Sequence, residues 1–127
     1  MQLTLRDDLP FVSLALTYRG TTLTVAQVLI DTGSASTLFA ARVVAPIGLL
    51  PEMTDEVYTV RGIGGTEAVF TRRVDRVVIE AQAVHDFEIE VGGMNYGFDI
   101  DGILGMDFLT RAGALINLRD LRLDFAP

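Results

Sequence analysis

Alternation of apolar and polar side chains is the dominant pattern along this chain. From Val12 to Tyr18 every second residue is apolar or aromatic, so these side chains fall on one side of an extended backbone. This period of two is typical of a half-buried β-strand. The Arg-Gly pair at 19–20 then predicts a tight turn into a second strand over residues 21–30, which is rich in Val, Leu and Thr.

Similar short segments recur along the rest of the chain. We expect strands over 56–60, 67–74, 76–84 and 86–91, and two more within 114–125, around Arg119-Asp120. One short helix is expected within 39–49, and another over 106–112, with Gly113 suited to end it and Asp107 placed as its N-cap. Many short strands with frequent turns indicate an all-β barrel or sandwich. The length and the absence of an internal repeat favour one domain over residues 1–127.

The composition limits the functional classes to which the protein can belong. The formal net charge is -7 and no cluster of Lys and Arg is present, which argues against a nucleic-acid partner. The chain has no cysteine, so disulfides and thiolate metal sites are excluded. No apolar run approaches the roughly 20 residues that span a bilayer, and the first residues do not resemble a signal peptide. We therefore expect a cytoplasmic protein without membrane contact; a soluble domain cut from a larger or anchored parent would have the same composition.

One acidic residue stands out because of its surroundings. The apolar run Val28-Leu29-Ile30 delivers Asp31 into the polar segment Thr32-Gly33-Ser34, and another apolar run follows from Leu38. A carboxylate at the end of a buried strand is costly unless hydrogen bonds or a partner support its charge. It can serve a structural purpose by bonding nearby backbone N–H groups in an Asx turn, and it can also serve chemistry.

This segment resembles the active-site signature of aspartic peptidases, which is an apolar pair followed by Asp-Thr-Gly-Ser. The resemblance implies that Asp31 activates a water for attack on a peptide carbonyl. It also implies that the Thr32 hydroxyl bonds across a pair of such loops, and that Gly33 allows the backbone to approach closely. A hydroxyl at Ser34, where retroviral enzymes commonly have Ala, can bond the ionised Asp31.

Two further segments are similar to parts of the same family. Gly62-Ile63-Gly64-Gly65, between two predicted strands, resembles the flap tip of retroviral proteases, whose backbone N–H groups reach the substrate. Residues 102–113 resemble the strand and short helix that lie behind the catalytic loop. Together the three segments identify the chain as a member of the retropepsin-like aspartic proteases, which implies one lobe of a closed β-barrel. The substrate-binding residues implied by the resemblance are Ser34, Ser36, Gly62, Ile63 and Gly64.

The chain contains a single Asp-Thr-Gly, whereas the family mechanism needs two carboxylates that share one proton. A second lobe does not fit in 127 residues, so the resemblance implies a homodimer with one Asp31 from each subunit. We expect an aspartic endopeptidase that cleaves extended peptides without a metal or cofactor. Two alternatives stay open: a non-catalytic peptide-binding or dimerisation module of the same fold, and a structural barrel in which Asp31 merely caps a turn.

The other polar residues give weaker indications of a functional site than Asp31 does. His85 is the only histidine and lacks the sequence context of a catalytic triad, so we expect it on the surface or in a loop. The spacing of Asp99 and Asp101 does not match a calcium loop. Glu88 and Glu90 lie at strand spacing and are expected to form a solvated face, and nothing in the sequence supports a preference for basic substrates.

Overall fold

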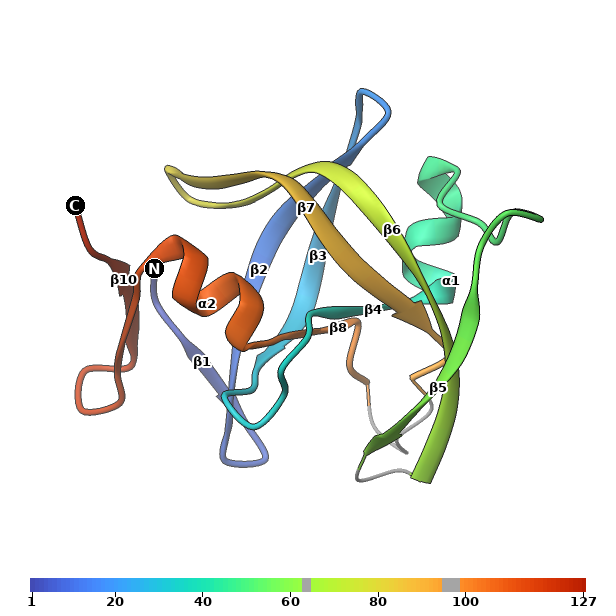
Figure 1. Cartoon of the computed structure of the whole chain (residues 1–127). Helices are drawn as coiled ribbons and strands as arrows, with labels where there is room; N and C mark the ends of the chain where they lie inside the picture. The colour runs from blue at the N-terminus through green and yellow to red at the C-terminus, as the bar shows by residue number, and fades with distance from the viewer. Residues whose placement is uncertain (63–64, 95–98) are drawn as a thin grey trace.

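The computed structural model describes residues 1–62, 65–94 and 99–127. Most of these residues lie in strands, and the helices are short (Figure 1). The strands are β1 (Thr4–Arg6), β2 (Leu9–Tyr18), β3 (Thr21–Ile30), β4 (Leu38–Ala40), β5 (Val57–Gly62), β6 (Gly65–Ile79), β7 (Gln82–Gly92), β8 (Gly102–Leu104), β9 (Ala114–Asn117) and β10 (Arg122–Phe125). The helices are α1 (Ala41–Val44), the 3-10 turn η1 (Ala45–Ile47) and α2 (Met106–Ala112).

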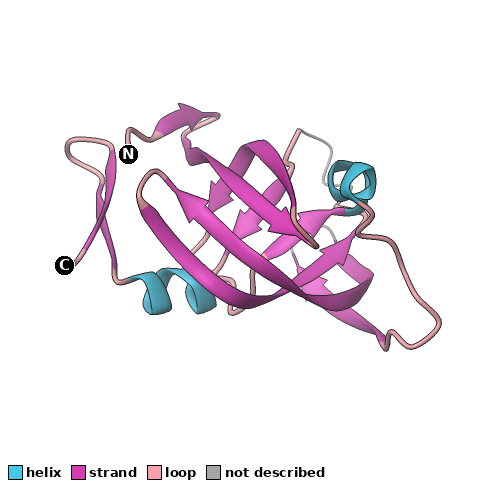
Figure 2. Ribbon diagram, turned by 90° about the horizontal axis from the view of Figure 1, so that it is seen from above, coloured by secondary structure: helices cyan, strands magenta, loops and turns pink. Residues whose placement is uncertain are grey.

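Eight strands form one sheet in the order β1-β2-β3-β8-β4-β7-β6-β5. An additional pairing of β2 with β6 joins two distant members of this order, so the sheet curls back on itself (Figure 2). Most pairs are antiparallel, but β8 lies parallel to β3, and β4 lies parallel to β7. The insertion of β8 between β3 and β4 brings the segment before α2 against the chain that follows β3.

The main core lies inside the curl of the sheet. It contains Val28, Phe39, Ile89, Leu104 and Phe108, each fully or almost fully buried. Phe87 and Phe108 meet edge to face, with ring centroids 5.8 Å apart, which fixes α2 against β7. A smaller cluster on the other face of the sheet is built from Phe11, Leu38, Ala40, Val69, Met94 and Ile100.

The last two strands form a separate antiparallel hairpin, β9–β10. Its inner face, which includes Leu123, packs against the main core, whereas Leu115 and Leu118 are exposed. The first residues of the chain run beside β10: the Leu3 amide donates to the Leu121 carbonyl at 2.8 Å, and the Leu123 amide donates to the Met1 carbonyl at 2.8 Å. The two termini therefore lie on the same side of the molecule (Figure 1).

Most elements match the sequence-based expectations, including the strands on either side of residues 19–20, α2 and the C-terminal hairpin. The prediction of a strand over 76–84 is wrong. β6 continues to Ile79, the chain turns at Glu80-Ala81, and β7 begins at Gln82. Glu80 adopts a positive φ of 52°, a conformation that is uncommon outside glycine, so the turn carries no typical sequence signal. The predicted helix within 39–49 is divided between the end of β4, α1 and η1.

Candidate active site

Asp31 directly follows β3, in a loop that leads to β4. Ile30 and Val28 are buried in the main core, which holds the strand in place up to its last residue. The Asp31 amide donates to the Leu104 carbonyl on β8 at 3.0 Å, so the ladder continues through Asp31 itself. The carboxylate is half-buried, and its Oδ1 accepts a hydrogen bond from the Gly33 amide at 2.9 Å. Thr32 and Gly33 are exposed.

The Asp31 loop is fixed from behind by the start of α2. The Met106 amide donates to the Ser34 carbonyl at 2.8 Å, and the Asp107 amide donates to the Ala35 carbonyl at 3.2 Å. Gly105 allows this approach: a Cβ at that position would lie 2.3 Å from the carbonyl oxygen of Ser36. Glycine is required here because a side chain would not fit. The backbone conformation does not require it, since a φ of -95° is open to any residue. The loop therefore rests on backbone atoms of a segment about seventy residues away in the chain.

Asp107 and Thr37 form the second support of the loop. Asp107 Oδ1 accepts hydrogen bonds from the Thr37 hydroxyl and the Phe108 amide, both at 2.7 Å, and Oδ2 accepts from the Thr37 amide at 3.2 Å. Thr37 is fully buried, and its hydroxyl also accepts from the Gly105 amide at 3.1 Å. The expectation that Asp107 caps α2 is wrong, because the N-cap position belongs to Gly105 and the carboxylate turns toward the Asp31 loop.

Ser34 makes a different contact from the one expected. Its hydroxyl donates to the Ser36 carbonyl at 2.7 Å, so its single proton is directed away from Asp31. The predicted bond to the ionised Asp31 is corrected accordingly, and the hydroxyl closes the turn of the loop instead. Ser34 and Ser36 are both half-buried beside the exposed residues of the loop.

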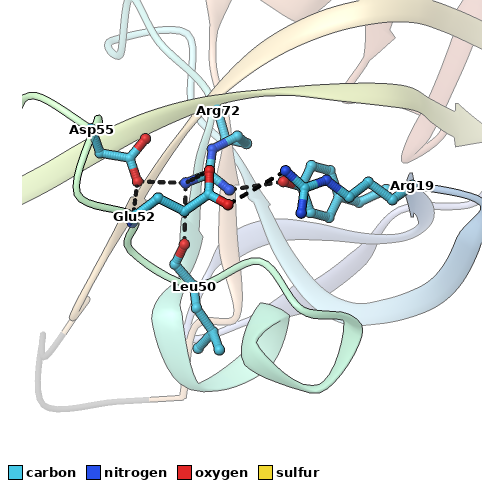
Figure 3. A network of polar contacts seen from close by, with 6 residues as sticks. Arg19, Leu50, Glu52, Asp55 and Arg72 are labelled. Carbon is cyan, nitrogen blue, oxygen red and sulfur yellow. Dashed lines mark hydrogen bonds and ion pairs between the residues drawn. The ribbon is translucent and has the colours of Figure 1, made fainter.

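The glycine-rich hairpin is built by β5 and β6, with Gly62 paired to Gly65 at its end. Ile63 and Gly64, which were predicted to contact substrate, lie outside the described residues. The segment before β5 is held to β6 by a polar network around Arg72, whose side chain is 11% exposed (Figure 3). Arg72 donates to the Leu50 carbonyl at 3.1 Å and to Asp55, and it lies 3.5 Å from Glu52.

Backbone hydrogen bonding contributes to the same network. The Glu52 amide donates to the Asp55 carboxylate at 2.6 Å, and the Asp55 amide donates to the Glu52 carbonyl at 2.9 Å. The bond from the Glu52 amide, together with Arg72, holds the pKa of Asp55 below its ordinary value. The segment that leads into the glycine-rich hairpin is thus tied to the sheet at its root.

Glu90 on β7 was expected in a solvated face, and this expectation is wrong for it: the residue is buried, at 9% exposure. Its carboxylate accepts a hydrogen bond from the Tyr58 hydroxyl on β5 at 2.8 Å. Burial, followed by the hydrogen bond to this carboxylate, raises the pKa of Tyr58 to about 12. Its neighbour at strand spacing, Glu88, does face solvent, with a side chain that is 56% exposed.

The remaining candidates lie apart from the loop. His85 is exposed, and its backbone carbonyl accepts a hydrogen bond from Arg111. Asp101 forms an ion pair with Arg42 at 3.1 Å. Among the residues that the structure describes, no group of three His, Cys, Asp or Glu side chains is arranged to hold a metal ion. Within the same residues, no helix has the length and apolar character needed to cross a membrane.

Comparison with known proteins tests the family directly. The sequence family described as "gag-polyprotein putative aspartyl protease" matches residues 22–111, which include the Asp31 loop, the glycine-rich hairpin and most of α2. The chain belongs to this family of retropepsin-like aspartic proteases. No curated protein matches the sequence.

The fold of these proteases is also confirmed by structure. A crystal structure of a retropepsin-like aspartic protease from Rickettsia conorii is similar, with a TM-score of 0.67. The similarity covers 96% of this chain and 94% of that chain at 18% sequence identity. At this identity it supports the one-lobe, β-rich retropepsin-like fold, and the arrangement of the strands agrees with it.

Three residues of the site were missed by sequence reasoning: Thr37 as a buried anchor, Asp107 as its acceptor, and Glu90 as a buried carboxylate. The sequence carried no signal for the burial of Glu90, because this residue alternates with apolar residues in the same way as exposed Glu88. For Thr37 and Asp107 the chain offers only two polar residues beside apolar runs, seventy positions apart.

Proposed function

We propose that this retropepsin-like chain is an aspartic endopeptidase whose catalytic pair consists of Asp31 from each of two identical subunits. The observation that carries the proposal is the loop itself. A carboxylate is held by the backbone of β3 and β8, is half-exposed, and is followed by exposed Thr32 and Gly33. A surface of this kind suits the approach of a second copy of the loop about a twofold axis.

In the proposed reaction one Asp31 is ionised and accepts a proton from a water, which attacks the peptide carbonyl. The other Asp31 is protonated and donates to the carbonyl oxygen, where negative charge develops. Two like charges about 3 Å apart do not ionise together easily, so the pair holds one proton. Thr32 would bond across the two loops, and Gly33 would permit their close approach. Substrate would lie extended beneath the two hairpins, pairing as an added strand.

Mixing experiments test the shared site. Asp31→Asn protein is added to a fixed amount of wild type, and peptide cleavage is measured after subunit exchange. Because a mixed dimer has one carboxylate, an equal amount of variant lowers the activity to about half, and a ninefold excess lowers it to about one tenth. Exchange is verified with two affinity tags. Unchanged activity despite verified exchange would contradict a site built from two subunits.

Inhibitors and chelators separate this proposal from other peptidase classes. A statine-containing peptide places a hydroxyl where the tetrahedral intermediate would lie, so it is expected to bind and inhibit. EDTA is expected to leave the activity unchanged. Dimers that bind such peptides yet cleave nothing in a diverse peptide library would favour the non-catalytic binding module over the enzyme.

A further inference from the structure

The sheet register places Glu90 on the same face as the catalytic carboxylate. Paired residues of neighbouring strands project their side chains to the same side of a sheet. Leu29 on β3 pairs with Ile103 on β8, Ile103 pairs with Leu38 on β4, and Leu38 pairs with Glu90 on β7. These four side chains therefore form one row across four adjacent strands.

Asp31 lies beside the β3 end of this row, two residues along the chain from Leu29. The amide of Asp31 still follows the ladder to Leu104, so the alternation of β3 runs one residue past Ile30. Ile30 is buried in the main core and Leu29 packs on the opposite face, so the alternation along the strand places Asp31 on the same face as Leu29. Leu29 and Ile103 on that face are only half-buried. The row is thus apolar and accessible beside the Asp31 loop. Three strands away it ends at the carboxylate of Glu90.

Tyr58 reaches Glu90 from the glycine-rich hairpin. It pairs with Val69 on β6, which pairs with Gly92 on β7, so the tyrosine lies over the same face two positions along β7 from Glu90. Among the described residues, the Tyr58 hydroxyl is the side-chain donor that the structure records for this carboxylate. A carboxylate has about four lone-pair positions, so one neutral donor leaves capacity for a cation.

We propose that Glu90, with Tyr58 as its positioning partner, is a specificity-determining residue that binds a Lys or Arg side chain of an extended peptide. This inference rests on the proposed function of the same site. Three strand spacings of about 4.8 Å separate Leu29 from Glu90, and an extended peptide advances about 3.3 Å per residue. The basic side chain is therefore placed within about four residues of the scissile bond. A buried carboxylate in an apolar row is costly when unpaired, and a bound cation offsets that cost.

The test uses a series of statine-containing peptides with apolar side chains, in which one position at a time carries either lysine or norleucine. These two side chains differ chiefly in the charged group. Equilibrium binding to wild type is expected to favour lysine over norleucine by about tenfold or more at one position within four residues of the statine. Glu90→Gln is expected to abolish that preference while binding the all-norleucine peptide as well as wild type does.

Glu88→Gln is the matched control, because it removes the same charge from the same strand, two residues away and exposed. It is expected to keep the lysine preference. Tyr58→Phe is expected to weaken the lysine preference without abolishing it, since the carboxylate remains but loses the hydroxyl that positions it. The subsite would be overturned by a lysine-to-norleucine ratio near one at every position, by equal losses in Glu88→Gln and Glu90→Gln, or by failure of the whole series to bind.

Turnover separates the two proposals. The same peptide series is also made without statine, so that its members can be cleaved. If none of them is cleaved, but the statine peptides show a lysine preference that depends on Glu90, the peptidase proposal is contradicted and the subsite is supported. Efficient cleavage that is indifferent to lysine at every position, in wild type and in Glu90→Gln alike, would support the peptidase and overturn the subsite.

Discussion

Asp31 and Asp107 are two carboxylates of one hydrogen-bonded unit, and they differ in how their oxygens are used. Asp107 accepts three hydrogen bonds from Thr37 and Phe108. Within the described part of its own chain, Asp31 accepts one hydrogen bond, from the Gly33 amide two residues away. A carboxylate with several fixed donors holds structure together, whereas one with spare lone pairs at an exposed loop is free to bind a proton, a water or a partner.

The same comparison explains the position of the two residues. Asp107 lies behind the loop, where its donors are buried or half-buried, and it aligns the backbone that carries Asp31. Asp31 lies in front, beside exposed Thr32 and Gly33. Substitutions at the two positions should therefore separate loss of activity from loss of stability.

The largest expected effect is that of Asp31→Asn on catalysis. An amide retains an oxygen for the Gly33 amide but is not a general base, so activity should fall by about 10²–10⁴-fold or more. The urea midpoint should change little. Peptide cleavage and urea unfolding of the same preparation check this. Substantial cleavage by the purified variant would refute the catalytic assignment of Asp31.

The largest expected effect on stability is that of Gly105→Ala. The added Cβ would lie 2.3 Å from the Ser36 carbonyl oxygen, so the Asp31 loop and α2 must separate. We expect a loss of more than about 3 kcal/mol in the free energy of unfolding. Gly20→Ala is the matched control: nothing lies within 4 Å of its Cβ, and only its positive φ of 81° opposes alanine, at about 1–2 kcal/mol. Equal urea midpoints for the two variants would contradict the close approach.

Asp107→Ala should be intermediate. It leaves the Thr37 and Phe108 amides and the Thr37 hydroxyl without their acceptor, which costs roughly 2–4 kcal/mol. Asp107→Asn keeps one oxygen and should lose about half as much. We expect the activity to decrease from wild type to Asp107→Asn to Asp107→Ala, in the same order as the free energy of unfolding. The activity of Asp107→Asn should recover at low temperature. A stable but inactive Asp107→Asn would instead place this carboxylate in the chemistry.

A smaller, pH-dependent effect is expected at Asp55, in the polar network around Arg72. Because its pKa is below the ordinary value of 3.8 in the folded chain, the ionised form stabilises the fold at neutral pH. This contribution to stability is fully present when the pH is above the pKa of Asp55 in the unfolded chain. It is lost as the pH falls through the pKa of Asp55 in the folded chain. The difference in urea midpoint between wild type and Asp55→Asn should be constant from about pH 7 to 5 and shrink near pH 3. A difference that grows on acidification would contradict the network.

The smallest effect is expected for Ser34→Ala. Its hydroxyl bonds to the Ser36 carbonyl, so its loss should cost about 1 kcal/mol of stability. Activity that depends on a shared proton should follow a bell-shaped pH profile, and this profile should be the same in the variant and in wild type. A shift of the acidic limb in the intact dimer would show that the Ser34 hydroxyl bonds to Asp31 in the paired state.

The local parts of this site could be predicted from sequence. The apolar run into Asp31, the glycine-rich hairpin and the segment 102–113 each carry their signal within about a dozen residues, because alternation and glycine placement are local properties. The two strands that flank residues 19–20 were predicted for the same reason.

Contacts between distant segments could not be predicted. The bond from Thr37 to Asp107 depends on the insertion of β8 between β3 and β4, which no local pattern specifies. Glu90 is buried and accepts a hydrogen bond from Tyr58, which arrives from another hairpin. The continuity of β6 was missed for a comparable reason. Separate strands over 67–74 and 76–84 were expected, but the Asp75 carboxylate between them accepts the amides of Arg19 and Gly20 from the neighbouring hairpin, and the strand continues past it.

The insertion of β8 also affects the order in which the site can form during synthesis. Asp31 leaves the ribosome before Leu104, Gly105 and Asp107, and its loop cannot be fixed until these residues are available to bond it. At roughly 5–20 residues per second, several seconds pass between the appearance of Thr37 and that of Asp107. Closing so long a segment carries an entropic cost and slows folding. The carboxylate is thus aligned only when most of the chain has folded around it, and an unfinished chain carries an Asp31 without its support.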